Sequence, residues 1–168
     1  RKQEGVYFAK DYSVNNKIIK VILLDTRYFR TALTADNETK KRFKPNLYGE
    51  GTMLGETQWE WLKNELQNSK ATYNIIVSSI QFLSDEHGFE AWGNMPHEAD
   101  KLVNLLKSSK TKNAIILSGD RHISEISKKE IDGLPYPLID FTSSGLTHSY
   151  SDFKGETNKY RLGNVVSK

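Results

Sequence analysis

The chain has 168 residues, of which 37% are hydrophobic, so it is long enough to form one core and does not have the composition of a disordered protein. Its 24 basic and 21 acidic residues give a formal charge of only +3, and the one short basic cluster is residues 40–42. A single cluster of that size is usually a solvated loop, so the charge distribution argues against a nucleic-acid-binding role. The absence of cysteine excludes disulfides and thiolate metal sites, and no apolar stretch in this segment predicts a signal peptide or a membrane span.

The first third of the chain is expected to form a β-hairpin and then a long loop. Residues 6–9 and 17–25 are rich in β-branched and aromatic side chains and flank the polar residues 11–16, a pattern typical of two paired strands. The stretch from Thr31 to Gly51 is polar and bounded by glycine. A loop of that length in a compact domain tends to be functional or mobile.

A helix is predicted from about Thr57. Thr57 and Glu60 fit a capping box, in which the threonine side chain accepts a hydrogen bond from the backbone of Glu60 and the glutamate reaches back. Trp59, Leu62 and Leu66 recur at i, i+3 and i+7, so they share one helical face. We expect these side chains to anchor the core.

A strand, a helix and a second strand follow. Residues 74–80 and 114–117 are apolar and rich in β-branched side chains, and the helix between them starts at Pro96, a residue that the first helical turn tolerates. Such a crossover makes the two strands parallel, so their carboxyl ends share one edge of the sheet. Residues 137–141 are expected to add a strand and residues 160–168 to begin another. The predicted fold class is therefore α/β.

Residues 119–122, which follow the strand at 114–117, read Gly-Asp-Arg-His. Chemistry in open α/β sheets gathers beyond the carboxyl ends of strands, where a glycine lets the backbone turn closely around a ligand. Asp120 and His122 offer one hard oxygen and one borderline nitrogen, a mixture that suits Zn, Mn, Fe or Co more than Ca alone. Gly-Asp is also an ordinary turn, and the motif by itself leaves both interpretations open.

Five segments of the chain carry the residues of a known family in the family's order: 53–62 (MLGETQWEWL), 75–81 (IIVSSIQ), 86–98 (EHGFEAWGNMPHE), 117–125 (LSGDRHISE) and 141–148 (FTSSGLTH). With these segments the chain resembles the PhoD-like alkaline phosphatases, a branch of the calcineurin-type metallophosphoesterases. The final metal motif of that superfamily reads Gly-His-x-His, and the PhoD-like branch has Asp at its first histidine. The resemblance therefore implies that Asp120 and His122 each face a different ion of a two-metal centre, with Fe, Mn, Zn or Ca as candidates.

The resemblance also implies a metallophosphoesterase-type α-β-β-α sandwich, with mixed sheets and flanking helices. The superfamily takes its other ligands from Asp-x-His, Gly-Asp and Gly-Asn-His-Asp/Glu motifs upstream of the matched segments. Residues 85–87 and 93–98 resemble two of these motifs but stand in the wrong order. We expect residues 1–168 to be a single domain, the C-terminal portion of a catalytic domain whose N-terminal half is its partner. A periplasmic or secreted location is implied by the family alone.

Four further side chains are candidates for the chemistry. Superfamily enzymes place a histidine after the preceding strand, where this chain has Gln81, which either binds metal or phosphate or only ties two loops together. His87 is a candidate for protonating the leaving group, and His148 for binding a phosphate oxygen. Arg27 is a candidate for bidentate phosphate binding, whereas Arg121 alternates with the two ligands and is expected to point away.

The function that these features favour is hydrolysis of a phosphomonoester or phosphodiester by a metal-bridging hydroxide. Two cations lower the pKa of bound water and clamp the attacking and leaving oxygens. The resemblance implies an alkaline phosphatase D-like enzyme, of which this segment alone has little activity. The alternative is a non-catalytic binding module or subunit that retains the fold. A serine hydrolase built on Ser144, Asp120 and His148 is poorly supported, because no Gly-x-Ser-x-Gly elbow precedes a helix.

Overall fold

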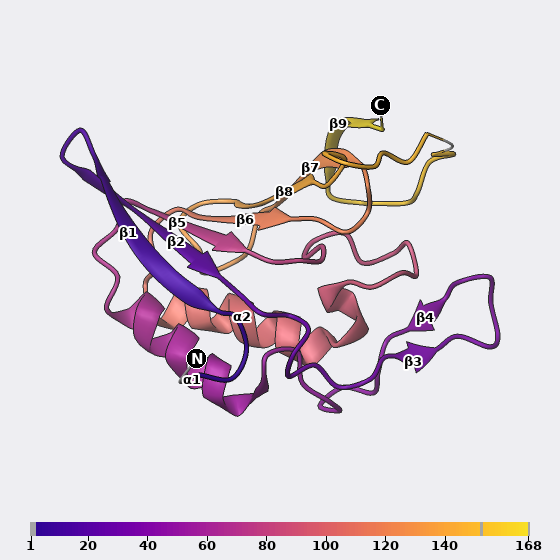
Figure 1. Ribbon diagram of the computed structural model, residues 1–168, viewed down its shortest axis with the longest axis horizontal. Helices are drawn as coiled ribbons and strands as arrows, with labels where there is room; N and C mark the ends of the chain where they lie inside the picture. Colours follow the sequence, from indigo (N-terminus) through magenta and orange to yellow (C-terminus); the bar gives the residue numbers. More distant parts are fainter. Residues whose placement is uncertain (1–2, 152, 168) are drawn as a thin grey trace.

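The computed structural model describes residues 3–151 and 153–167, which form one large sheet with two helices on one of its faces (Figure 1). The large sheet has seven strands in the order β1-β2-β5-β6-β8-β7-β9. Their bounds are β1 Phe8–Val14, β2 Lys17–Leu23, β5 Tyr73–Val77, β6 Ala114–Ser118, β7 Ser124–Lys129, β8 Leu138–Ser143 and β9 Arg161–Val166. The remaining elements are the short strands β3 Thr34–Ala35 and β4 Phe43–Lys44, the helices α1 Gly55–Gln67 and α2 Pro96–Ser108, and a 3-10 turn at Trp92–Asn94.

The large sheet is mixed, and its central strands are parallel. β2, β5, β6 and β8 run parallel to one another, whereas β1 pairs with β2, and β7 with β8 and β9, in the antiparallel sense. The predicted crossover from β5 through α2 to β6 is confirmed, with Ile75 opposite Ile115 and Val77 opposite Leu117. The α/β fold class is thus confirmed, and the loops that follow the parallel strands share one edge of the sheet.

The N-terminal hairpin is present, but its first strand is not where the sequence places it. β1 starts at Phe8 and continues through the polar residues to Val14, because each of its residues pairs with β2. The turn consists of Asn15 and Asn16, with φ values of 47° and 60°, a left-handed geometry that asparagine tolerates in two-residue hairpins. Backbone pairing at the sheet edge therefore outweighs the polarity of the side chains.

The capping box predicted for α1 is wrong. The helix begins at Gly55, so Thr57 lies inside its first turn. Its N-terminal region is held instead by the side chain of Glu98, which projects from α2 and is 3% exposed. The Glu98 carboxylate accepts hydrogen bonds from the Met53 amide at 2.6 Å and the Trp59 indole at 2.8 Å. This contact joins the first turn of α2 to the start of α1.

The hydrophobic core lies between the two helices and the sheet. The predicted buried face of α1 is confirmed, since Trp59, Leu62 and Leu66 are all buried. Pro96 occupies the first turn of α2, and that helix buries Leu102 and Leu106. No helix among the described residues is long and apolar enough to cross a membrane.

The sheet face opposite the helices is apolar, and no other layer of the described chain covers it (Figure 1). Leu117, Phe141, Ile126 and Leu162 are successive register partners across β6, β8, β7 and β9. Of these, Phe141, Ile126 and Leu162 are 40–48% exposed. Phe8 and Tyr12 extend the same face at the other end of the sheet, because they pair with Leu23 and Ile19. Monomeric proteins rarely expose a contiguous apolar patch of this extent.

The long segment between residues 31 and 51 is a loop that projects beyond one end of the sheet, as Figure 1 shows at the right. It contains the two-residue strands β3 and β4, which pair through Thr34 with Lys44 and Ala35 with Phe43. The strand expected within residues 160–168 is β9, which ends at Val166. Residue 168 of the expected segment lies outside the described residues. The sequence analysis did not predict β7, whose SEISKK sequence alternates polar and apolar side chains only weakly.

The buried Glu98 carboxylate is expected to be important for stability. Burial opposes its charged form, yet the hydrogen bonds from Trp59, Met53 and Thr52 lower its pKa below the ordinary 4.5. Glu98→Gln should therefore lower the free energy of unfolding by about 1–3 kcal/mol, the cost of weakening buried hydrogen bonds to a charge. Glu60→Gln, an exposed change on α1, should stay within about 0.5 kcal/mol of the parent. Equal effects of the two variants in urea unfolding would contradict this role.

Candidate metal centre

The turn after β6 presents Asp120 and His122 to solvent on an unusual backbone. Both residues have positive φ values, 74° and 56°, in the left-handed region that is uncommon for residues other than glycine. Arg121 between them is 8% exposed, so the turn directs its first and third side chains outward and the middle one inward. Backbone strain of this kind is found preferentially at functional sites.

The turn is held by the segment that follows β8. The His122 amide donates a hydrogen bond to Ser144 Oγ at 2.7 Å, and the Tyr150 amide donates to the His122 carbonyl at 2.9 Å. The ring of His148 lies edge-on to the ring of His122, with 5.1 Å between their centroids. The parallel pairing of β6 with β8 thus brings His148 beside His122, as expected from the shared sheet edge.

Arg121 anchors the turn from behind. Its guanidinium forms an ion pair with Glu156 and lies 3.9 Å above the centre of the Phe89 ring. Burial raises the pKa of Glu156, while the charge of Arg121 acts in the opposite direction. The inward orientation expected for Arg121 is therefore observed, and its contacts link the turn to the loops that carry Phe89 and Glu156.

An open pocket of about 350 Å3 lies beside the two candidate ligands. Arg27 reaches it from the loop after β2, where its guanidinium forms an ion pair with Glu90 and approaches Asp120 Oδ1 to 3.5 Å. The walls are formed by residues from five separate segments: Arg27, Arg42, Phe89, Glu90, Asp120, Arg121, His122 and Tyr150. Arg42 belongs to the short basic cluster at residues 40–42, and no motif in the sequence marked it as a pocket residue.

Gln81 and His87 do not line this pocket. Gln81 is 1% exposed, and its amide nitrogen donates to Glu125 at 2.7 Å and to Thr142 at 2.8 Å. His87 accepts a hydrogen bond from the Phe89 amide at 3.0 Å. Within the described part of the chain, Gln81 Oε1 and His87 Nε2 are buried without a hydrogen-bond partner, a rare condition for buried polar atoms.

Two buried carboxylates near Gln81 were missed by the sequence analysis. Glu125 accepts hydrogen bonds from Gln81, Asn158 and Arg161. Asp140 is fully buried within β8 and accepts from the backbone amides that follow Gln81 in the chain. A charged residue in the middle of an apolar strand was the available signal for Asp140, whereas β7 was not predicted and so gave none for Glu125.

The described residues supply part of a metal site. No group of three His, Asp or Glu side chains within residues 3–151 and 153–167 is close enough to hold an ion. Asp120 and His122 contribute one oxygen and one nitrogen donor at one wall of the pocket, a mixture that divalent transition metals accept. They fit such a site as two of its ligands and require further donors to complete the coordination.

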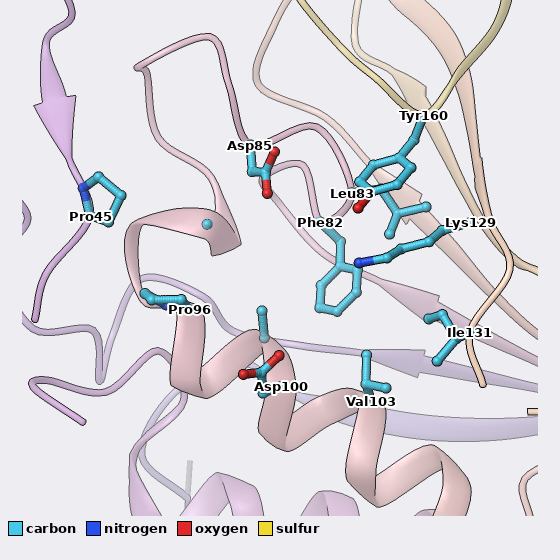
Figure 2. A pocket seen from close by; sticks show the side chains of 12 residues that line it. Pro45, Phe82, Leu83, Asp85, Pro96, Asp100, Val103, Lys129, Ile131 and Tyr160 are labelled. Atoms are coloured by element: carbon cyan, nitrogen blue, oxygen red, sulfur yellow. The ribbon is translucent and has the colours of Figure 1, made fainter. Parts of the chain in front are cut away.

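A second pocket, of about 290 Å3, lies between α2 and the segments that carry Lys129, Ile131 and Tyr160 (Figure 2). Phe82, Leu83 and Val103 form its apolar floor, and carboxylates lie at its rim. None of the residues that the sequence analysis proposed for catalysis or metal binding lines it. Of the residues proposed from the sequence, Arg27, Asp120 and His122 line the pocket of about 350 Å3 instead.

Most of the chain matches one known protein family. The model of the family described as "PhoD-like phosphatase" matches residues 15–158, a span that includes Arg27, Asp120 and His122. The chain belongs to this family. Alkaline phosphatase D of Bacillus subtilis is 28% identical over 118 residues, which are 66% of this chain and 20% of that protein. The chain thus spans about one fifth of the length of this curated relative.

Two solved structures share the fold. The structure described as that of PhoD superposes with a TM-score of 0.63 at 24% identity, covering 81% of this chain and 28% of the other. GAP50, described as the anchor in the inner membrane complex of Plasmodium, gives a TM-score of 0.57 at 18% identity and covers 97% and 44%. Both likenesses concern the fold alone.

The half-buried imidazole of His87, whose Nε2 atom is buried, should make stability depend on pH. Burial, the larger cause, and the positive charge of Arg121, the second, lower the pKa of His87 from 6.5 to about 4. The unfolded chain therefore binds more protons than the folded protein between these values, and the free energy of unfolding should fall as the pH decreases from 6.5 towards 4. His87→Gln should flatten this part of the profile, measured by urea unfolding at several pH values. Parallel profiles for parent and variant would show that His87 titrates normally.

Proposed function

We propose that the chain is part of a metal-dependent phosphoester hydrolase and that Asp120 and His122 are metal ligands in it. The observation that carries this proposal is the turn after β6, where two potential ligands with positive φ flank a buried arginine at the edge of a shared pocket. Membership of the PhoD-like phosphatase family supports the reaction class. The alkaline phosphatase D relative supports it as well.

The roles proposed for this chain follow from charge. Bound cations would screen the phosphate and lower the pKa of the attacking water. Asp120 and His122 would hold them, with the remaining ligands supplied by residues outside this chain. Arg27 is placed to bind a phosphate oxygen, because its guanidinium lies 3.5 Å from Asp120 and lines the same pocket. His148, beside His122, is proposed to bind the substrate from the opposite loop.

For Gln81 and His87 the geometry favours positioning over contact with the substrate. Gln81 connects the loop after β5 to β7 and β8 through Glu125 and Thr142. The ring of His87 stacks on Phe89, which in turn lies under the Arg121 guanidinium. We therefore propose that both side chains fix the loops behind the turn.

The uncovered apolar face of the sheet supports a partner from the same protein. Phe141, Ile126 and Leu162 lie on that face, and the known relative is about five times longer than the matched region. We propose that a further sheet of the full protein packs there, which would complete the α-β-β-α sandwich and bring the missing metal ligands to the pocket. A location outside the cytoplasm is proposed from the family resemblance.

A non-catalytic module is the second candidate. The observation that favours it is the incomplete set of metal donors among the described residues. The fold is also found in GAP50, whose description is that of an anchor. A module of this kind would retain the pocket and the buried polar network but would bind no metal in the full-length protein.

The two candidates differ in what the full-length protein does when its ligands are changed. His122→Ala should lower both metal content and kcat, because losing a ligand disturbs the ion itself. Asp120→Asn keeps the shape and one oxygen but removes the charge, so partial metal with a large loss of rate is expected. In both variants the loss of kcat should exceed the roughly 10–100-fold effect that is typical of a residue that only orients a ligand. Metal analysis and hydrolysis of p-nitrophenyl phosphate and its bis ester measure them.

His97→Ala is the matched control, since this histidine lies on α2 and bonds the Gly51 carbonyl away from the pocket. It should retain metal and activity. If the Asp120 and His122 variants behave like this control, the turn is not a metal site. If the parent binds no metal and hydrolyses neither ester, the non-catalytic candidate is correct.

A further inference from the structure

Arg42 is the one arginine at the pocket without a carboxylate partner in the described part of the chain. Of the three arginines that line the pocket, Arg27 is paired with Glu90 and Arg121 with Glu156. No described Asp or Glu lies within ion-pair distance of the exposed Arg42 guanidinium, which lines the pocket and lies 5.1 Å from the centre of the Phe43 ring. Its charge is therefore available to a ligand.

The position of Arg42 is determined by its backbone. The amides of Arg42 and Phe43 both donate to the Gly88 carbonyl, at 3.1 and 2.9 Å. Gly88 has a φ of 77°, and a Cβ atom there would lie 2.4 Å from the Lys41 side chain, so the loop packs directly on this glycine. The neighbouring Phe89 and Glu90 form the pocket wall. The long loop thus delivers Arg42 to the pocket through contacts with that wall.

The two acidic residues of the β3–β4 hairpin, Asp36 and Glu38, are engaged elsewhere. Glu38 forms an ion pair with Lys44 at 2.9 Å, which closes the β3–β4 hairpin. Asp36 accepts hydrogen bonds from the backbone amides of Glu38 and Thr39. Neither carboxylate pairs with Arg42, although both belong to its own hairpin. The hairpin therefore presents a basic residue to the pocket while it satisfies its acidic residues internally.

We infer that Arg42 forms a second anion subsite, and that the substrate carries an anionic group in addition to the scissile phosphate. The inference rests on the proposed function. Arg27, at 3.5 Å from Asp120, already serves the position next to the candidate ligands, whereas Arg42 reaches the pocket from the distant loop. A guanidinium that has no carboxylate partner and contacts only an aromatic ring keeps its N–H donors for the paired oxygens of a carboxylate or phosphate. The substrate class is thus a phosphoester bearing a second carboxylate or phosphate.

The test compares substrates that differ by one anionic group. In the full-length protein, 3-phosphoglycerate is compared with glycerol 3-phosphate, and fructose 1,6-bisphosphate with fructose 6-phosphate. The preference for the more anionic member of a pair is measured as the ratio of the two kcat/KM values. Arg42→Ala should lower this ratio by about tenfold, which corresponds to the loss of one charge-assisted hydrogen bond. Arg42→Lys should keep part of the preference. Lys40→Ala, an exposed charge of the same loop outside the pocket, should leave the ratio as in the parent.

A loss that is equal for both members of each pair would overturn the inference, because it would place Arg42 at the scissile phosphate. An unchanged ratio would overturn it as well. Calorimetric binding of the same four compounds provides a readout that does not depend on turnover. Absence of hydrolysis with Arg42-dependent binding of the more anionic compounds would refute the proposed function while supporting the subsite. Hydrolysis without an Arg42-dependent preference would support the proposed function while refuting the subsite.

Discussion

The loops at the carboxyl edge of the sheet depend on buried carboxylates that accept hydrogen bonds from backbone amides. Asp140, fully buried in β8, accepts from the amides of Phe82 and Leu83 at 2.8 and 2.9 Å and so fixes the loop after β5. Asp25 accepts from the amides of Arg27 and Tyr28 and fixes the loop after β2. Burying a charge is costly unless several donors surround it, so each carboxylate keeps its loop in one arrangement. These loops carry the walls of the candidate pocket.

The turn after β6 combines strain with support on both sides. Asp120 and His122 adopt positive φ values, which few non-glycine residues do without compensation. The compensation comes from the Arg121 ion pair with Glu156 and from the hydrogen bond between the His122 amide and Ser144. As proposed ligands on a backbone held in this way, Asp120 and His122 would bind an ion without the entropic cost of ordering a flexible loop. The uncovered apolar face supports the proposal that further residues of the full-length protein pack against this sheet.

Sequence reasoning succeeded where a pattern has a single structural meaning. The β5–α2–β6 crossover and the buried face of α1 followed from periodicity, and the outward orientation of Asp120 and His122 followed from their alternation with Arg121. It failed where the outcome depends on tertiary contacts. Glu98, remote in sequence, replaced the expected capping box, and the loop after β5 turned Gln81 inward towards Glu125. The approach of Arg42 to the pocket depends on its packing against Gly88, which no local motif encodes.

Anomalous diffraction from crystals of the full-length, metal-loaded protein tests the central claim most directly. The account predicts metal density within about 2.0–2.3 Å of a carboxylate oxygen of Asp120 and a ring nitrogen of His122, with the remaining ligands from outside this chain. It also predicts that a sheet of the full-length protein covers Phe141, Ile126 and Leu162. A metal centre located elsewhere, with both Asp120 and His122 beyond coordination distance, would contradict the account.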